Sequence, residues 1–452
     1  MVIGGFCVAG IAFSTQPLLH VVTSEVLPRR WRGWGQASNL VFITLGGLLG
    51  LFVGAALNRS GSAGSDGFRY YYYMAMSCFF IAAVVCIIVY KPRPLETQTM
   101  FTTAEKLSRL DWYGYALLAT GLTLFTLGLS YFYNPYPWSN PHVFAIFTIG
   151  LAISIILVIY ETVFKKDGLF HHGLFSRNRN FAISSVCICC EGVAFTAVNI
   201  YFTYHVNTFY EKDEIFVAIR YSFKYTIAAI FACLAGWFCM VTRRTRWLTT
   251  VSFALFLIFF ICMATSGRGL RSNHAVWGYT VFLGAAFGIT LTTLVTVAQL
   301  STPPELISIA SGLIISLRAL GNTVGLAIYN AVFHEALDKL WENVAQAVVP
   351  QGLSPPDVQR FIAALESHNS TDLYAIPNVT ESIIQSGTTA FLDTYVWAFR
   401  YVWITAGCFV FLSGVAASFL IDEPEQFSMR IDHPIEEEGL YALSRGGEKH
   451  PV

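Results

Sequence analysis

The chain has 452 residues, of which 55% are hydrophobic and only 12% are charged. Soluble domains carry about 25% charged residues, so this composition excludes a soluble globular protein and indicates an integral membrane protein. The 28 basic and 28 acidic residues give a formal net charge of +0, which excludes the strongly basic surface typical of nucleic-acid-binding proteins.

Apolar windows of about 20 residues, the length that crosses a bilayer as a helix, predict the fold class. Charges, prolines and glycine clusters separate the windows from one another. We therefore expect an all-α membrane protein with about 11 transmembrane helices. The predicted spans are residues 2–24, 38–57, 71–90, 112–133, 142–161, 181–204, 221–241, 247–265, 276–299, 306–333 and 398–421.

The distribution of lysine and arginine over the loops predicts the orientation, because cytoplasmic loops carry the excess of basic residues. It places the amino terminus outside and the carboxyl tail inside. Arg220 and Lys224 are assigned to an outer loop in this scheme. Asn369 and Asn378 stand in N-x-S/T tripeptides of the outer segment 334–397 and are candidate glycosylation sites. The amphipathic start of that segment is expected to lie along the membrane surface.

Two spans share the pattern LGxxxGL, at 45–51 and 320–326. Glycines four residues apart lie on one helix face and allow close helix packing, which is the simplest role for them. A pattern that occurs in two halves is also typical of transporters built from repeated bundles. The glycines of this predicted packing motif are Gly46, Gly50, Gly54, Gly321 and Gly325.

Two opposite charges lie near the middle of predicted spans, Glu191 in 181–204 and Arg318 in 306–333. A charge at the bilayer centre costs roughly 2.5 to 3.5 kcal/mol and needs a partner, a watery cavity or neutralisation. In helical projection Asn199 lies to the side of the Glu191 face, and Asn322 shares the stripe of Arg318.

Two interpretations of these charges stay open. The first is a buried ion pair that fixes two helices against each other. The second is a proton-coupling site in which Glu191 is protonated and released during transport. Gln16 in the first span is a weaker candidate for substrate or proton contact, because helix-to-helix hydrogen bonding is sufficient to explain it. The sequence has no phosphate-binding loop, nucleophile elbow, zinc motif or dinucleotide fingerprint, and we expect no enzyme activity, metal or cofactor.

Several stretches are more specific in combination than alone. They are "SEVLPRRWRGWGQAS" (24–38), "EKLSRLDWYGYAL" (105–117), "FKKDGLFHHGLFSRNRNFA" (164–182), "TTLVTVAQLSTPPELISIASGL" (292–313), "SLRALGNTVGLAIYNAVF" (316–333) and "FLIDEPEQFSMRID" (419–432). With them the chain resembles the major facilitator superfamily, and specifically the fungal trichothecene efflux pump-like branch of the fourteen-span drug:proton antiporters.

This resemblance implies two helical bundles that alternate access to a central site. It assigns 1–95 to the remainder of the first bundle, 96–165 to two extra linker spans, 166–421 to the second bundle and 422–452 to a cytoplasmic tail. It also implies that the sequence begins within the fourth span of the family. The glycine-rich second span resembles the family's antiporter motif but lacks its proline.

The implied function is proton-coupled efflux of small apolar molecules such as toxins, drugs or secondary metabolites. We expect a monomer in the plasma membrane, with a vacuolar or vesicle membrane as the alternative, whose partners are a small-molecule substrate, protons and the lipid bilayer. Two other functions remain open, a siderophore-iron transporter and a truncated membrane protein that does not transport.

Overall fold

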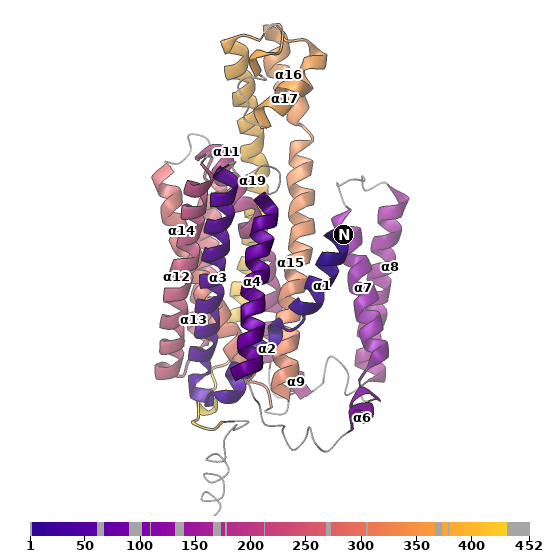
Figure 1. Ribbon diagram of the computed structural model, residues 1–452, viewed down its shortest axis with the longest axis vertical. Helices are drawn as coiled ribbons and strands as arrows, with labels where there is room; N and C mark the ends of the chain where they lie inside the picture. Colours follow the sequence, from indigo (N-terminus) through magenta and orange to yellow (C-terminus); the bar gives the residue numbers. More distant parts are fainter. Residues whose placement is uncertain are drawn as a thin grey trace, which may run out of the picture.

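The computed structural model describes residues 2–60, 67–89, 102–108, 110–131, 140–165, 173–176, 179–211, 213–267, 273–303, 306–366, 373–377 and 379–431. Within these ranges the secondary structure is helical, without a strand, and eleven helices are long and apolar enough to cross a membrane (Figure 1). The predicted all-α membrane fold and the predicted number of spans are confirmed.

The first predicted span is bent rather than continuous. Helix α1 (Val2–Phe13) ends at a turn, and α2 (Gln16–Val26) begins with a proline at its second position. In the turn the Ser14 hydroxyl donates to the carbonyl of Ile11 at 2.6 Å. The bend has a local cause, because Pro17 has no backbone N–H and cannot continue the hydrogen-bond ladder. Helices α3 (Arg32–Ser60) and α4 (Gly67–Val89) follow.

Helices α7 (Trp112–Ser130) and α8 (Pro141–Ile159) form an antiparallel hairpin at the right of Figure 1. The buried residues of α7 are three glycines, Gly114, Gly121 and Gly128. A Cβ at Gly128 would lie 2.7 Å from the Phe147 backbone of α8. Small residues at this spacing let the two backbones approach closely. The π-helical turn η3 (Tyr160–Phe164) continues α8, and α6 (Thr103–Ser108) and α9 (Gly173–Ser176) are short.

Six long helical segments make up the rest of the membrane part, here named the second bundle. Helix α14 is the most buried of them, and α12 packs against both α14 and α3. The segments are α10 (Asn180–Thr196) continued by the π-helical turn η4 (Ala197–Phe202) and α11 (Thr203–Phe209), then α12 (Glu214–Thr242), α13 (Arg246–Ala264), α14 (Asn273–Leu300), α15 (Ile307–Leu337) and α19 (Glu381–Ala417).

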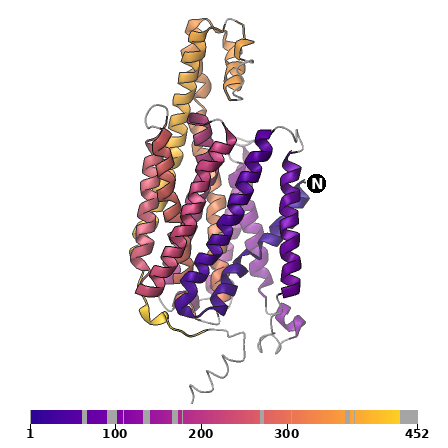
Figure 2. The same cartoon turned by 60° about the vertical axis from the view of Figure 1, so that its left-hand side comes forward.

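The described residues of the segment that was predicted to lie outside form a helical cap. Helices α16 (Leu340–Val348) and α17 (Val358–Glu366) pack against the first turns of α19 and project beyond the bundle (Figures 1 and 2). Their apolar faces meet each other rather than a membrane surface, with Phe361 fully buried. Helix α19 begins at Glu381, 17 residues before the predicted 398, because its first turns contribute to this apolar core.

The segment that follows α19 joins the ends of the helices opposite to this cap. The Asp422 carboxylate accepts the backbone N–H groups of Thr245 at 2.7 Å and Arg246 at 2.9 Å, and so caps α13. The backbone N–H of Arg29 donates to the carbonyl of Arg430 at 3.1 Å. The tail therefore contacts both the turn before α3 and the second bundle.

The expected domain boundaries at 95/96 and 165/166 touch residues outside the described ranges, as do the candidate glycosylation residues Asn369 and Asn378. The division 1–95, 96–165, 166–421 and 422–452 therefore stays a prediction.

Candidate functional site

Glu191 and Arg318 form a bidentate ion pair between α10 and α15. The Arg318 Nε lies 2.6 Å from Glu191 Oε2, and its Nη2 lies 3.2 Å from Oε1. The Glu191 side chain is fully buried, while 14% of the Arg318 side chain is exposed. Both carboxylate oxygens are engaged, the strongest geometry for such a pair. The two charges that the sequence placed at similar depth are thus in contact.

Glycines bring α10 and α15 together at this depth. A Cβ at Gly321 would collide with the carbonyl oxygen of Cys189, and one at Gly325 would lie 2.9 Å from the Cα of Val193. On the opposite helix, a Cβ at Gly192 would collide with the carbonyl of Arg318 itself. The close approach sets the reach of the Arg318 side chain to Glu191, so packing and pairing depend on each other.

Two stacked phenyl rings lie beside the ion pair. Phe195 of α10 and Phe287 of α14 have centroids 5.3 Å apart and planes inclined by 14°. The Arg318 guanidinium carbon lies 4.6 Å from the Phe195 centroid. The ammonium of Lys224, on α12, lies 4.7 Å from the same centroid and 5.1 Å from that of Phe287. Two cations therefore share one pair of rings.

Lys224 was assigned to an outer loop, and the structure corrects this. It lies within α12 and its side chain is fully buried. Arg220, one turn earlier in the same helix, is also buried and lies 3.6 Å from Glu211. The predicted span began at residue 221 and so left Arg220 outside it, whereas α12 begins at Glu214; the loop assignment of Lys224 conflicted with the predicted span itself. Aromatic residues on both sides of Lys224 in "YSFKY" were the available signal for a buried position.

Asn199 joins the site through Lys224 rather than through Glu191. It lies in the π-helical turn η4. Its Oδ1 accepts one hydrogen bond from the Lys224 ammonium at 3.1 Å and another from the Tyr221 hydroxyl. Tyr221 OH also accepts from Lys224 at 2.8 Å. Single π-helical turns are frequent at functional sites because they re-aim side chains.

The other two candidates are placed differently. Asn322 lies one turn after Arg318, and its backbone carbonyl accepts the Thr196 hydroxyl at 2.9 Å. Its buried amide oxygen accepts no hydrogen bond from the described residues. Gln16 lies half-buried at the start of α2, and no described contact joins it to the Glu191 pair.

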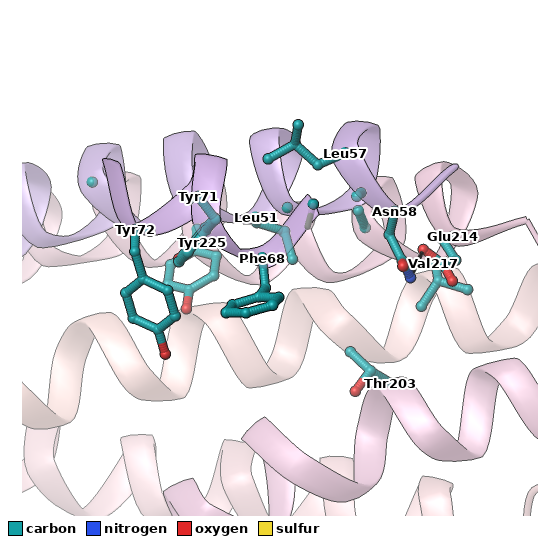
Figure 3. Close-up of a pocket in the computed structure, with 17 residues that line it drawn as sticks. Leu51, Leu57, Asn58, Phe68, Tyr71, Tyr72, Thr203, Glu214, Val217 and Tyr225 are labelled. Atoms are coloured by element: carbon teal, nitrogen blue, oxygen red, sulfur yellow. Dashed lines mark hydrogen bonds between the residues drawn. The ribbon is translucent and has the colours of Figure 1, made fainter. Parts of the chain in front are cut away.

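A cavity of about 960 Å³ lies between α3, α4 and α12. Figure 3 shows the rings of Tyr71, Tyr72 and Tyr225 at one end and Asn58 with Glu214, which are hydrogen-bonded to each other, at the other. The volume is within the range of small-molecule sites. Because Tyr225 also lies against Lys224, with its centroid 4.8 Å from the ammonium, this residue connects the cavity to the charged cluster.

The glycines of α3 do not all have the packing role that we expected. A Cβ at Gly50 would lie 3.0 Å from the hydroxyl oxygen of Tyr71 of α4, and one at Gly54 would lie 3.8 Å from the Tyr71 ring, whereas no atom lies within 4 Å of a Cβ at Gly46. The close contact with α12 is made by Gly47, where a Cβ would lie 2.8 Å from the Tyr225 ring. Two glycines of the pattern therefore lie beside α4, while the close contact with α12 comes from a residue outside the pattern.

A second polar cluster joins α2 and α3 to the second bundle. His20 Nδ1 lies 2.6 Å from the side-chain oxygen of Gln36, and the Gln36 amide donates to Gln299 at 3.2 Å. Gln299 in turn donates to the Ser311 hydroxyl at 2.9 Å, while the fully buried Arg32 donates to the Gln299 carbonyl at 3.3 Å. These hydrogen bonds fix the contact between the two halves in this conformation.

The described residues contain no group of three His, Cys, Asp or Glu side chains placed to hold a metal ion. The chemistry that this arrangement supports is electrostatic: one carboxylate, two cations, and hydrogen-bonding groups in a low-dielectric interior.

A family model described as Major Facilitator Superfamily matches residues 1–326. An MFS-type efflux transporter of Pyricularia grisea is 22% identical over 360 residues, which cover 78% of this chain and 57% of that protein. A trichothecene efflux pump of Trichoderma arundinaceum is 21% identical over 403 residues, covering 85% of this chain and 65% of the pump. An efflux pump of Emericella nidulans is 24% identical over 421 residues, covering 88% and 70%. The matches thus span 57 to 70% of the length of these three relatives.

Proposed function

Because the chain belongs to the Major Facilitator Superfamily, we propose that it exports small apolar molecules across a membrane in exchange for protons. The observation that carries the proton coupling is the fully buried Glu191 carboxylate, paired with Arg318 across α10 and α15. The names of its relatives, two of which are efflux pumps and one an efflux transporter, support the direction of transport.

The coupling follows from the charge of the pair. An ionised Glu191 attracts Arg318, and this attraction stabilises the contact between α10 and α15. A proton on Glu191 removes that attraction, and the arginine, which stays charged, must find another partner or water. Each proton bound therefore changes the relative energies of two arrangements of the second bundle, which is the requirement for coupling.

The substrate site that we propose lies between the two bundles, residues 1–95 and 166–421. The 960 Å³ cavity between α3, α4 and α12 supports it, because the rings of three tyrosines provide apolar surface for a small ligand, while Asn58, Glu214 and Thr203 provide groups that can orient it. A plasma membrane location and a monomeric state complete the proposal.

The test is transport by the 452-residue chain reconstituted in liposomes with an imposed pH difference. Rhodamine 6G and a radiolabelled trichothecene are the probes. The wild type should move at least one of them faster as the pH difference grows, and Glu191→Gln should lose this dependence. Glu335→Gln, at an exposed carboxylate near the outer end of α15, is the matched control and should behave as the wild type.

An unchanged pH dependence in Glu191→Gln, in protein that is folded and inserted, would rule out the proposed role of Glu191. Movement of neither probe by the wild type under any pH difference would reject export of these two compound classes.

A further inference from the structure

Lys224 is the second cation of the buried cluster, and its surroundings differ from those of Arg318. Its ammonium donates to two neutral oxygens, Asn199 Oδ1 at 3.1 Å and Tyr221 OH at 2.8 Å. Four aromatic rings surround it, with centroids at 4.7 to 5.1 Å. Among the described residues, no carboxylate oxygen lies within 4.0 Å of its nitrogen.

The cluster therefore contains two cationic side chains and one carboxylate. Each oxygen of Glu191 accepts from Arg318, and neither lies within 4.0 Å of the Lys224 nitrogen. A buried charge without an opposite charge is expensive in a low-dielectric interior. Arginine stays protonated in proteins, whereas a buried lysine exchanges its proton readily. Of the three groups, Lys224 is the one whose charged form is least stabilised by its neighbours.

The groups that face Lys224 come from each helix packed around it. The π-helical turn η4 contributes Asn199, and α12 contributes Tyr221 and Tyr225. Helix α14 contributes the Phe287 ring, and its Gly284 lies against the backbone of Lys224, where a Cβ would be 2.7 Å from the carbonyl oxygen. Glu191 of α10 and Arg318 of α15 are the charged groups, across Phe195 and Phe287.

We propose that Lys224 is a second proton-binding group of this site, which exchanges a proton with water of the neighbouring cavity past Tyr225. The amine takes one proton to become an ammonium and returns the same proton to water, with no other bond made or broken. A neutral amine has two N–H donors, which matches the two hydrogen bonds to neutral oxygens. The faces of the four aromatic rings stabilise the charged ammonium through cation–π interactions.

This role rests on the proposed function and makes it more specific. When Lys224 is an ammonium, it repels Arg318 across the stacked rings and attracts Glu191. When Lys224 is a neutral amine, Arg318 is the only cation of the cluster that attracts Glu191. Proton binding at Lys224 therefore controls the ion pair that joins α10 and α15, and one buried carboxylate serves two competing cations.

A difference titration tests the inference without any substrate. Purified wild type and Lys224→Met are titrated in the same detergent between about pH 5 and pH 9, a range that an ordinary lysine leaves untouched. The wild type should bind about one proton more than the variant toward the acid end. Lys339→Met, at an exposed lysine of the outer cap, should match the wild type over the same range.

Replacement of a buried charge by an apolar side chain is often tolerated, and Lys224→Gln serves as a second variant if Lys224→Met does not fold. A flat difference curve for the folded variant would overturn the inference. Transport in liposomes gives the separate arm: with rhodamine 6G, Lys224→Met should lose most of the pH dependence and Lys224→Arg, whose charge is fixed, should block coupled export. A wild type that ignores the pH difference would refute the proposed function, while the titration still decides on Lys224.

Discussion

Hydropathy and burial rank helices α4 and α14 in opposite orders. Helix α4 is the more apolar of the two, yet none of its described residues is buried, whereas 89% of the most apolar stretch of α14 is buried. In lipid an apolar side chain gains little from contact with another helix, so hydropathy selects spans but not their neighbours.

The difference lies in small and polar residues. Helix α14 has Gly284 and Gly288 against α12, and a buried hydroxyl at Thr290 that donates to Ser252 of α13 at 2.7 Å. Helix α4 presents exposed phenyl and aliphatic groups such as Phe79. The helices of the second bundle pack closely enough to enclose Glu191 and its two cations.

The largest expected effect comes from removal of the shared carboxylate. Glu191→Ala leaves Arg318 and Lys224 buried without an opposite charge and should lower the free energy of unfolding by about 3 to 5 kcal/mol. Chemical unfolding in detergent micelles measures this. The double variant Glu191→Met with Arg318→Met should lose much less, because no uncompensated partner of the pair remains. Equal losses in the single and double variants would show that the pair is not the source of the effect.

The second expected effect compares two glycines of the LGxxxGL repeats. Gly321→Ala places a methyl group against the backbone of Cys189 and should cost about 1 to 3 kcal/mol through forced separation of α10 and α15. Gly46→Ala meets open space and should be neutral or slightly stabilising. Thermal unfolding of both variants decides this, and a larger loss at Gly46 would reverse the assigned contacts.

The smallest expected effect compares two phenylalanines. Phe287→Ala removes a ring from the buried stack and should cost about 2 kcal/mol of unfolding free energy, less than the roughly 3 to 5 kcal/mol of water-soluble cores, because lipid offers an apolar ring nearly the same surroundings. Phe79→Ala removes a ring that is 71% exposed and should change the stability by less than about 0.5 kcal/mol. The same micelle unfolding assay applies, and similar losses at the two sites would contradict the assigned difference in packing.

The sequence predicted the spans and one ion pair because both have a local cause. A bilayer requires about 20 apolar residues from each helix, and this requirement is visible without any neighbour. Glu191 and Arg318 stood out since a charge within such a window is costly. The early start of α19 was missed even though Thr380 caps its first turn, because α16 and α17 cover the apolar face of the first turns of α19 only in the tertiary structure.

Lys224 and Asn199 needed the tertiary structure. Lys224 is the fourth residue of its predicted span, where hydropathy does not separate a loop from a helix interior. Asn199 lies in a π-helical turn, and the extra residue of that turn changes the direction of its side chain. A helical projection with a fixed period does not include such an extra residue.

The sequence by itself determined that this protein lies in a membrane, how many times its chain can cross, and that two opposite charges share one depth. Only the tertiary structure decided which glycines carry close contacts, and that a second cation shares the rings beside the single carboxylate. The physical reason is that insertion depends on the composition of one helix, whereas the free energy of a buried charge depends on every side chain that surrounds it.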